Sequence, residues 1–149
     1  METILSLVTT VCLGSMIGVE FAVSAFVNPI LKQLDDSARA NATRLFAQKF
    51  GSVMPFWYGL SLLLLIAETI IMRERLGVGF LVAASVIWAA TIALTLMFLV
   101  PINNRIAKMN VAKFTDALRQ EHAKWDALHR WRVLVLVVAM ICMLIGIRL

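Results

Sequence analysis

The sequence predicts an all-α integral membrane protein that folds as a four-helix antiparallel bundle. Of its 149 residues, 61% are hydrophobic and 15% are charged, whereas an average soluble domain is about half apolar and a quarter charged. No linker, repeat or low-complexity tract divides the chain, so we expect one domain over residues 1–149. Four apolar segments are near or above the ~20 residues that cross a bilayer as a helix, and they cover about residues 4–31, 53–72, 78–100 and 128–147.

The basic residues predict how the bundle is oriented. Eleven of the 14 Lys and Arg residues lie in or beside segments 32–52 and 101–127, and the opposite side holds only Arg73, Arg75 and Arg148. By the positive-inside rule both segments are cytoplasmic and both termini lie outside, as in a bacterial inner-membrane protein. The net charge of +5 is explained by this topology, so we expect a lipid bilayer, and no nucleic acid, as the partner of these charges.

The first span is predicted to be a transmembrane helix and not a secretory signal. Its start, METILSLV, has no basic residue, and its apolar run is too long for a signal core. Gly14 and Gly18 form a small-xxx-small pattern that lets two helices approach closely. This pattern serves either a neighbouring helix of the bundle or a second copy in a homo-oligomer.

Glu20 is the clearest candidate for a functional residue in the first span. An ionisable side chain at mid-helix costs about 2.5–3.5 kcal/mol on insertion scales. Glu20 precedes Lys32 by well over two helical turns, which is too far for a glutamate to reach the interface. Ser24 and Asn28 follow at i+4 and i+8, so the three side chains form a polar stripe that must face protein or water.

The segment after Leu31 is predicted to contain a short interfacial helix. Asp35, Asp36 and Ser37 can cap this helix. Its expected apolar face consists of Ala42, Leu45, Phe46 and Phe50.

Gly51 and Pro55 are then expected to mark the turn into the second span. Trp57 and Tyr58 fit an interfacial aromatic belt. At the far end of this span, Glu68 is expected to point outward to water or to nearby arginines.

The third span ends in VPINNR. Pro101 removes a backbone donor and leaves carbonyls near Met97 short of a hydrogen bond. Asn103 lies where such carbonyls need donors, and Thr91 and Thr95 point toward the same end, although a helical threonine often bonds only its own helix.

The fourth span is predicted to be part of one helix over residues 110–147, because this stretch contains no Pro and no Gly before Gly146. Its cytoplasmic extension is amphipathic. The residues expected to share its packed face are Phe114, Leu118, Glu121, Trp125, Leu128 and Arg132.

Because neighbouring spans run antiparallel, the unusual polar residues should meet at the cytoplasmic end of the bundle. His129 can exchange protons near neutral pH, and Arg132 can bind an oxyanion. With Trp125 as an aromatic wall, they would suit an aromatic acid or phenol. The alternative is an interfacial belt whose side chains extend toward lipid phosphates, and the residues alone leave both readings open.

No metal site is predicted. His122 and His129 are seven residues apart, about 10.5 Å along a helix, which is too far for them to share one metal. Cys12 and Cys142 lie within apolar spans and are expected to pack as small hydrophobic residues. There is also no glycine-rich phosphate loop and no nucleophile elbow, so no motif of the sequence supports a cofactor.

Three motifs carry a resemblance to a known family. VNPIL ends the first span, VPINNRI ends the third, and WDALHRWR begins the fourth. In this order and spacing they resemble the DUF1772 family, the anthrone oxygenase-like membrane proteins, over essentially the whole chain. The matching positions are Pro29, Pro101, Asn103, Trp125, His129 and Arg132.

The resemblance implies oxidation of a hydrophobic phenolic or quinone-like molecule by O₂, without metal or flavin, as in a cofactor-independent monooxygenase. It implies that His129 is the base, that Arg132 and Asn103 bind the oxyanion, and that Trp125 is the stacking wall. The stripe of Glu20, Ser24 and Asn28 would complete the substrate site.

Two other functions remain open from the sequence. A lone glutamate in the first of four spans also resembles small multidrug-type transporters, in which Glu20 would be the proton-coupled site. A non-enzymatic accessory or structural membrane protein would use the polar cluster only to hold its helices together.

Overall fold

The computed structural model describes residues 2–108 and 115–149, and every element in these residues is helical. The elements form four rods. They are α1 (Glu2–Ala22), η1 (Val23–Val27) and α2 (Asn28–Leu31); α3 (Asp36–Ile71); α4 (Val78–Leu94), η2 (Thr95–Leu99) and α5 (Val100–Lys108); and α6 (Asp116–Gly146). All four rods are long and apolar enough to cross a membrane. The predicted all-α, four-span bundle is therefore confirmed, and the chain is an integral membrane protein.

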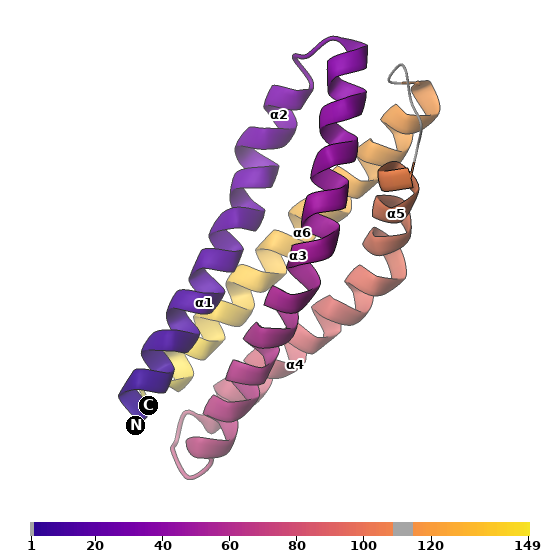
Figure 1. Cartoon of the computed structure of the whole chain (residues 1–149). Coiled ribbons are helices and arrows are strands. Elements are labelled where there is room, and N and C mark those ends of the chain that lie inside the picture. The colour runs from indigo at the N-terminus through magenta and orange to yellow at the C-terminus, as the bar shows by residue number, and fades with distance from the viewer. Residues whose placement is uncertain (1, 109–114) are drawn as a thin grey trace.

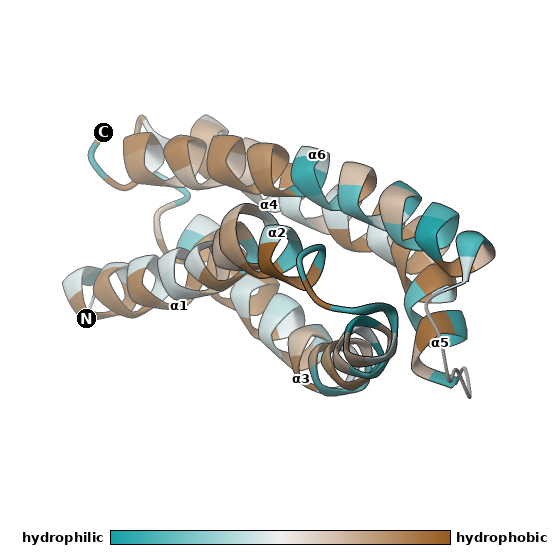
Figure 2. Ribbon diagram, turned by 90° about the horizontal axis from the view of Figure 1, so that it is seen from above, coloured by the Kyte–Doolittle hydropathy of each residue, from teal (hydrophilic) through white to brown (hydrophobic). Residues whose placement is uncertain are grey.

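The rods run antiparallel, so the bundle has two distinct ends (Figure 1). The two termini and the α3–α4 connection lie at one end, called here the terminal end. The α2–α3 connection, the last turn of α5 and the first turn of α6 lie at the other, the loop end. Figure 2 shows that α6 changes from hydrophilic residues at the loop end to hydrophobic residues at the terminal end.

The prediction of a separate interfacial helix before the second span is wrong. α3 runs without interruption from Asp36 to Ile71 and contains both Gly51 and Pro55. Helix breakers are tolerated in membrane helices because neighbouring helices supply the lost packing and hydrogen bonds.

The expected packed face of this segment also differs. Ala40, Thr43 and Ala47 are buried, whereas Leu45 and Phe46 are exposed. The apolar periodicity before the second span therefore reflects a surface of the bundle that faces lipid or a cavity, and not a core face.

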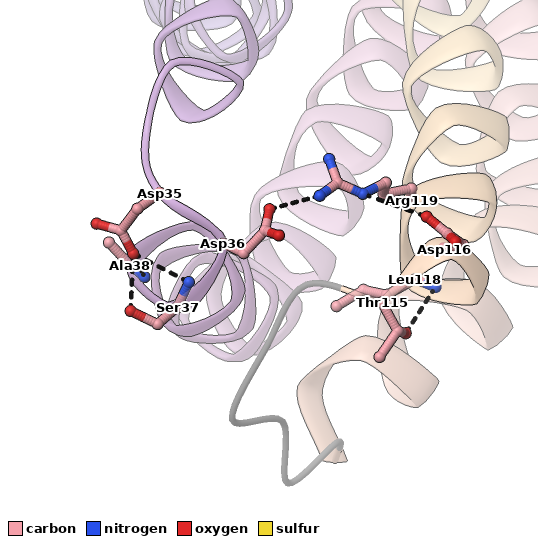
Figure 3. Close-up of polar contacts among 8 residues, drawn as sticks. All are labelled: Asp35, Asp36, Ser37, Ala38, Thr115, Asp116, Leu118 and Arg119. Carbon is pink, nitrogen blue, oxygen red and sulfur yellow. Dashed lines mark hydrogen bonds and ion pairs between the residues drawn. The ribbon is translucent and has the colours of Figure 1, made fainter.

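The start of α3 is capped as the sequence suggests. The Asp35 carboxylate accepts hydrogen bonds from the backbone N–H groups of Ser37 and Ala38 at 3.0 and 2.9 Å (Figure 3). These bonds stabilise the ionised form and hold the pKa of Asp35 below its ordinary value of 3.8. Arg119 of α6 forms an ion pair with Asp36, so the first turns of α3 and α6 are joined.

Each of the two wide π-helical turns directly precedes a proline-containing turn. In η1 the Asn28 N–H bonds the Val23 carbonyl, and in η2 the Val100 N–H bonds the Thr95 carbonyl. Pro29 and Pro101 follow these donors, and neither has an N–H to continue the ordinary pattern. The carbonyl disruption predicted near Met97 thus takes the form of a widened turn.

The main apolar core fills the terminal-end half of the bundle, where side chains of all four rods meet around Leu13, Leu65, Trp88 and Leu136. A smaller cluster at the loop end packs Ala40, Ala47, Ile102, Ile106 and Leu118 together. The cavity described below adjoins both clusters, because Tyr58 of the main core and Ala47 and Ile106 of the smaller cluster line it.

Glycine permits the closest backbone contact at the terminal end. A Cβ atom on Gly77 would lie 2.1 Å from the carbonyl oxygen of Gly146. A Cβ atom on Gly14 would meet Met140 of α6 at 3.4 Å, whereas Gly18 has open space around it. Gly14 therefore packs inside the bundle, and an oligomer through Gly18 stays a prediction.

Candidate functional site

A cavity of about 360 Å³ lies toward the loop end, and all four rods line it. Its wall is mainly apolar and includes Val27, Leu31, Phe46, Phe50, Leu96 and Leu99. Its polar lining includes Glu20, Asn28, Thr43, Tyr58, Thr95, Asn103, His122, His129 and Arg132. Both wide turns contribute to the wall, so the two prolines shape the cavity from opposite rods.

Glu20 is the centre of a polar network at one side of the cavity. Its side chain is 3% exposed, which agrees with the prediction that it faces protein. Arg132 Nη2 donates to Glu20 Oε2 at 2.6 Å, and the Tyr58 hydroxyl donates to Oε1 at 3.0 Å. Because the Arg132 side chain is itself only 10% exposed, this is a largely buried ion pair.

His129 is held on both of its ring nitrogens. Nε2 lies 3.0 Å from the backbone carbonyl oxygen of Glu20, and a carbonyl can only accept, so Nε2 carries a proton. Nδ1 lies 2.8 Å from Arg132 Nη2 and 3.1 Å from Glu20 Oε2. In neutral His129, Nδ1 accepts from Arg132, and in the protonated form Nδ1–H donates to Glu20. Nδ1 therefore lies between a donor, Arg132, and an acceptor, Glu20.

Trp125 lines the cavity and stacks on the His129 ring, with ring centroids 4.6 Å apart and an interplanar angle of 12°. The stack fixes the tilt of the imidazole. Arg132 also lines the cavity, and its Nε atom is buried with no hydrogen-bond partner in the part of the chain that the structure describes. A buried guanidinium donor without a partner is costly, and an acceptor on a ligand would satisfy it.

The other predicted site residues differ in how they lie. Asn28 is buried and lines the cavity. Asn103 also lines it, but Nδ2 of its amide donates to the Ala47 carbonyl at 2.9 Å and so joins α5 to α3. An amide nitrogen has two hydrogens, so one hydrogen of Asn103 Nδ2 is used in this bond and the other is not.

Ser24 is partly buried and is not among the cavity-lining residues. The wide turn η1 includes Ser24 and accommodates one additional residue. This shifts the helical register between Glu20 and Asn28, which both reach the cavity.

The prediction that Tyr58 belongs to an interfacial belt is wrong. Tyr58 is 5% exposed, bonds Glu20, and lies under the Arg132 guanidinium at 5.5 Å from the ring centroid. The sequence feature that could have predicted this contact is the position of Tyr58 in the second span, at the same depth as Glu20 in the antiparallel first span. Trp57, expected in the same belt, is partly buried and donates from Nε1 to the Cys12 carbonyl at 3.2 Å.

Asp126 was missed entirely. The buried face of α6 carries His122, Asp126 and His129, whereas the predicted face ends in Leu128 and Arg132. The two faces share Leu118, which is buried as predicted. Beyond Leu118 they are one residue apart, and apolar spacing alone does not separate them. Phe114, the first residue of the predicted face, lies outside the described residues.

Two threonine hydroxyls at the cavity lack the hydrogen bond to their own helix that several other hydroxyls of the bundle make. Thr91 Oγ1 donates to the Ile87 carbonyl at 2.7 Å, and Thr9, Thr69 and Ser85 bond their own helices in the same way. Thr43 and Thr95 line the cavity, and their buried hydroxyl oxygens find no partner among the described residues. A turn about the Cα–Cβ bond would offer either hydroxyl to a bound molecule.

Glu68 does not point outward as predicted. Its side chain is fully buried, and its two carboxyl oxygens lie 3.3 Å from Ser6 Oγ and 3.2 Å from Thr9 Oγ1. It lies at the terminal end and does not line the cavity. The hydroxyls of Ser6 and Thr9 on α1 therefore take the place of the water or arginine predicted as hydrogen-bond partners of Glu68.

Comparison with protein families identifies the group to which this arrangement belongs. The model of the anthrone oxygenase family matches residues 43–142. The chain belongs to the anthrone oxygenase family. This confirms the predicted family, and the match contains the VPINNRI and WDALHRWR motifs, whereas VNPIL precedes it. No curated protein and no solved structure has significant similarity to the chain.

The anthrone oxygenase match includes Tyr58, Asn103, Trp125, His129 and Arg132, whereas Glu20 and Asn28 precede it. Three partners of the Glu20 carboxylate thus lie within the family region, and the carboxylate itself lies outside it. Within the described residues, no group of three or more His, Cys, Asp or Glu side chains could hold a metal ion.

Proposed function

We propose that this member of the anthrone oxygenase family binds a hydrophobic phenolic or quinone-like molecule in the cavity and oxidises it with O₂. The observation that carries the proposal is the network of Glu20, Arg132 and His129 at the side of an apolar chamber. In such a chamber little water competes, so charge that develops on a substrate interacts strongly with fixed donors.

The proposed substrate carries a CH₂ group in conjugation with an aromatic ketone. Arg132 Nη2 turns away from His129 Nδ1, which then accepts one CH₂ proton, and Glu20 stabilises the imidazolium that results. The carbanion delocalises onto the ketone oxygen. Arg132 Nε–H and the remaining N–H of Asn103 are the donors proposed to bind this oxyanion, with Trp125 forming the aromatic wall.

The electrons for the next step come from the substrate. The delocalised anion reduces O₂, a carbon–oxygen bond forms, and the peroxide anion takes the proton back from His129. Loss of the second C–H proton and cleavage of the O–O bond then release water and leave a new carbonyl group. The net reaction converts one CH₂ group and one O₂ into one carbonyl group and one water, so it needs no further reductant.

The test is turnover by purified protein in lipid nanodiscs, with a hydroxyanthrone as substrate. Oxygen uptake and anthraquinone absorbance should exceed spontaneous autoxidation, and ¹⁸O₂ should label the new carbonyl. We expect His129→Ala to lower the rate by about 10²–10⁴-fold, the usual contribution of a general base. Glu68→Gln is the control, because Glu68 is buried but remote from the cavity.

Two results would count against the proposal. One is wild-type turnover no faster than autoxidation in empty nanodiscs, which would favour an accessory role. The other is a haem, flavin or copper band in the absorption spectrum of active protein, which would contradict cofactor-free chemistry.

The transport alternative predicts a different behaviour of Glu20. A transporter glutamate must exchange its partners for a proton or a cationic substrate, whereas Glu20 is bound by Arg132, His129 and Tyr58. Proton-linked efflux from proteoliposomes that disappears in Glu20→Gln, with no oxygen uptake by the wild type, would favour transport.

A further inference from the structure

A second polar cluster lies behind the cavity wall, between α2 and α6. Asp126 is 4% exposed, and its carboxylate accepts from Asn28 Nδ2 at 2.7 Å, Arg130 Nη2 at 3.0 Å and Lys32 Nζ at 3.3 Å. The proposed oxidation uses neither Asp126 nor its two cationic partners. This cluster therefore needs an explanation of its own.

The cluster presents an excess of positive charge at the surface. The Lys32 and Arg130 side chains are 46% and 56% exposed, whereas the Asp126 side chain is 6% exposed. Two cations and one carboxylate leave a net charge of +1, carried by the groups that reach outward. The same three residues line an open groove together with Trp131 and Leu134.

The positions of the groove residues relative to the apolar segments indicate the depth at which the groove lies in the membrane. Lys32 directly follows the first apolar segment, and Arg130 lies near the start of the fourth. Trp131 is 70% exposed, and Leu134 is 57% exposed nearer the apolar part of α6. Lys32 and Arg130 form a cationic part of the groove, and Trp131 and Leu134 form an aromatic and apolar part. This arrangement matches the boundary between lipid headgroups and acyl chains. This end is also the predicted cytoplasmic side, where anionic lipids are common.

We propose that the groove between α2 and α6 binds one anionic glycerophospholipid. Its phosphodiester lies between Lys32 and Arg130, and an acyl chain runs along Trp131 and Leu134. A single phosphodiester charge balances the single excess positive charge of the cluster. A zwitterionic lipid does so less well, because its own cation would lie near Lys32 and Arg130.

The site has a structural link to the cavity. Asn28 lines the cavity and also donates to Asp126. A lipid that orders Lys32 and Arg130 around Asp126 would therefore also stabilise the part of the cavity wall that follows η1. This link does not depend on the chemistry of the cavity.

The test is lipid binding to the detergent-purified full chain, measured by native mass spectrometry. Phosphatidylglycerol and phosphatidylcholine with identical acyl chains are titrated in parallel, and we expect selective retention of phosphatidylglycerol. Lys32→Gln and Arg130→Gln should each weaken its binding about fivefold, the usual effect of one basic residue near an anionic headgroup. Lys124→Gln is the matched control, because Lys124 is an exposed cation of α6 outside the groove.

Asp126→Asn gives a test of opposite sign. The amide oxygen can still accept from Asn28, while the charge of the cluster rises from +1 to +2, so phosphatidylglycerol should bind more tightly. Circular dichroism of each variant verifies folding, and the Arg130→Gln arm suffices if Lys32→Gln does not fold.

Several outcomes would overturn the proposal. They are equal binding of the two lipids by wild type, the same loss in Lys124→Gln as in Arg130→Gln, or weaker binding by Asp126→Asn. Displacement of the lipid by millimolar inorganic phosphate would show a simple anion site and not a lipid site. Failure of anthrone turnover would leave the lipid measurement unaffected.

Discussion

Two glutamates are buried in the spans of this protein, and the structure treats them differently. Glu20 is bound by an arginine, a histidine and a tyrosine beside a cavity. Glu68 is bound by two hydroxyls of α1 and does not line that cavity. Neither is exposed by more than 3%. The comparison teaches that burial alone does not distinguish these two carboxylates; the cation and the cavity beside Glu20 do.

The largest effect should come from removing the cation of the Glu20 network. Arg132→Met leaves Glu20 buried without its principal partner, and breaking a buried pair costs about 3–5 kcal/mol of stability. Denaturant titration in micelles should show this loss. The double variant Arg132→Met with Glu20→Leu should recover much of the stability without recovering oxygen uptake. A single variant as stable as wild type would contradict the ion-pair assignment.

The next prediction compares the two glutamates directly. Glu20→Gln should lower the rate of oxygen uptake about 10²-fold or more, because the imidazolium of His129 loses its counterion. Glu68→Gln should leave the rate within about twofold and change stability by roughly 1 kcal/mol or less, since Gln can still bond both hydroxyls. Equal losses of rate in both variants would show that burial, and not the network, matters.

A smaller effect is expected from the threonines. Thr95→Val should weaken binding of a non-reactive hydroxyanthraquinone by about fivefold, the effect of one hydrogen bond worth ~1 kcal/mol. Thr91→Val is the matched control, one turn away on the same rod, because its hydroxyl already bonds the Ile87 carbonyl. Quenching of tryptophan fluorescence measures both affinities. If Thr91→Val weakens binding as much as Thr95→Val, the loss reflects packing.

The smallest effect concerns the cap of α3, which is remote from both glutamates. Hydrogen bonds to the Asp35 carboxylate hold its pKa below 3.8, so the cap is fully present above that pH. As the pH falls through the lowered pKa, Asp35 is protonated and the cap is lost. Hydrogen exchange at the amides of Ser37 and Ala38, corrected for the intrinsic pH dependence, should then increase. Asp35→Asn should remove this pH dependence, because Asn caps without titrating.

Much of the site was predictable once the spans were recognised. Long apolar segments and the distribution of arginine and lysine indicated antiparallel rods, and these rods necessarily bring Glu20, Asn103 and His129 to one end. The prolines after the first and third spans indicated disturbed backbone at the same level. Composition and helical spacing carry this information because they depend on the bilayer and on the geometry of one helix at a time.

The partners of each side chain depended on tertiary structure. Tyr58 bonds Glu20, and Asp126 joins Asn28, only because separate rods pack at particular rotations, and one residue of helical register decides which face is inside. Gly51 and Pro55 did not end a helix, since contacts from neighbouring rods outweigh local propensity. The sequence by itself determined a four-span anthrone oxygenase-family bundle with Glu20, Asn103 and His129 toward one end. Packing alone decided which carboxylate received an arginine and a cavity, because that choice depends on contacts between residues more than 100 positions apart.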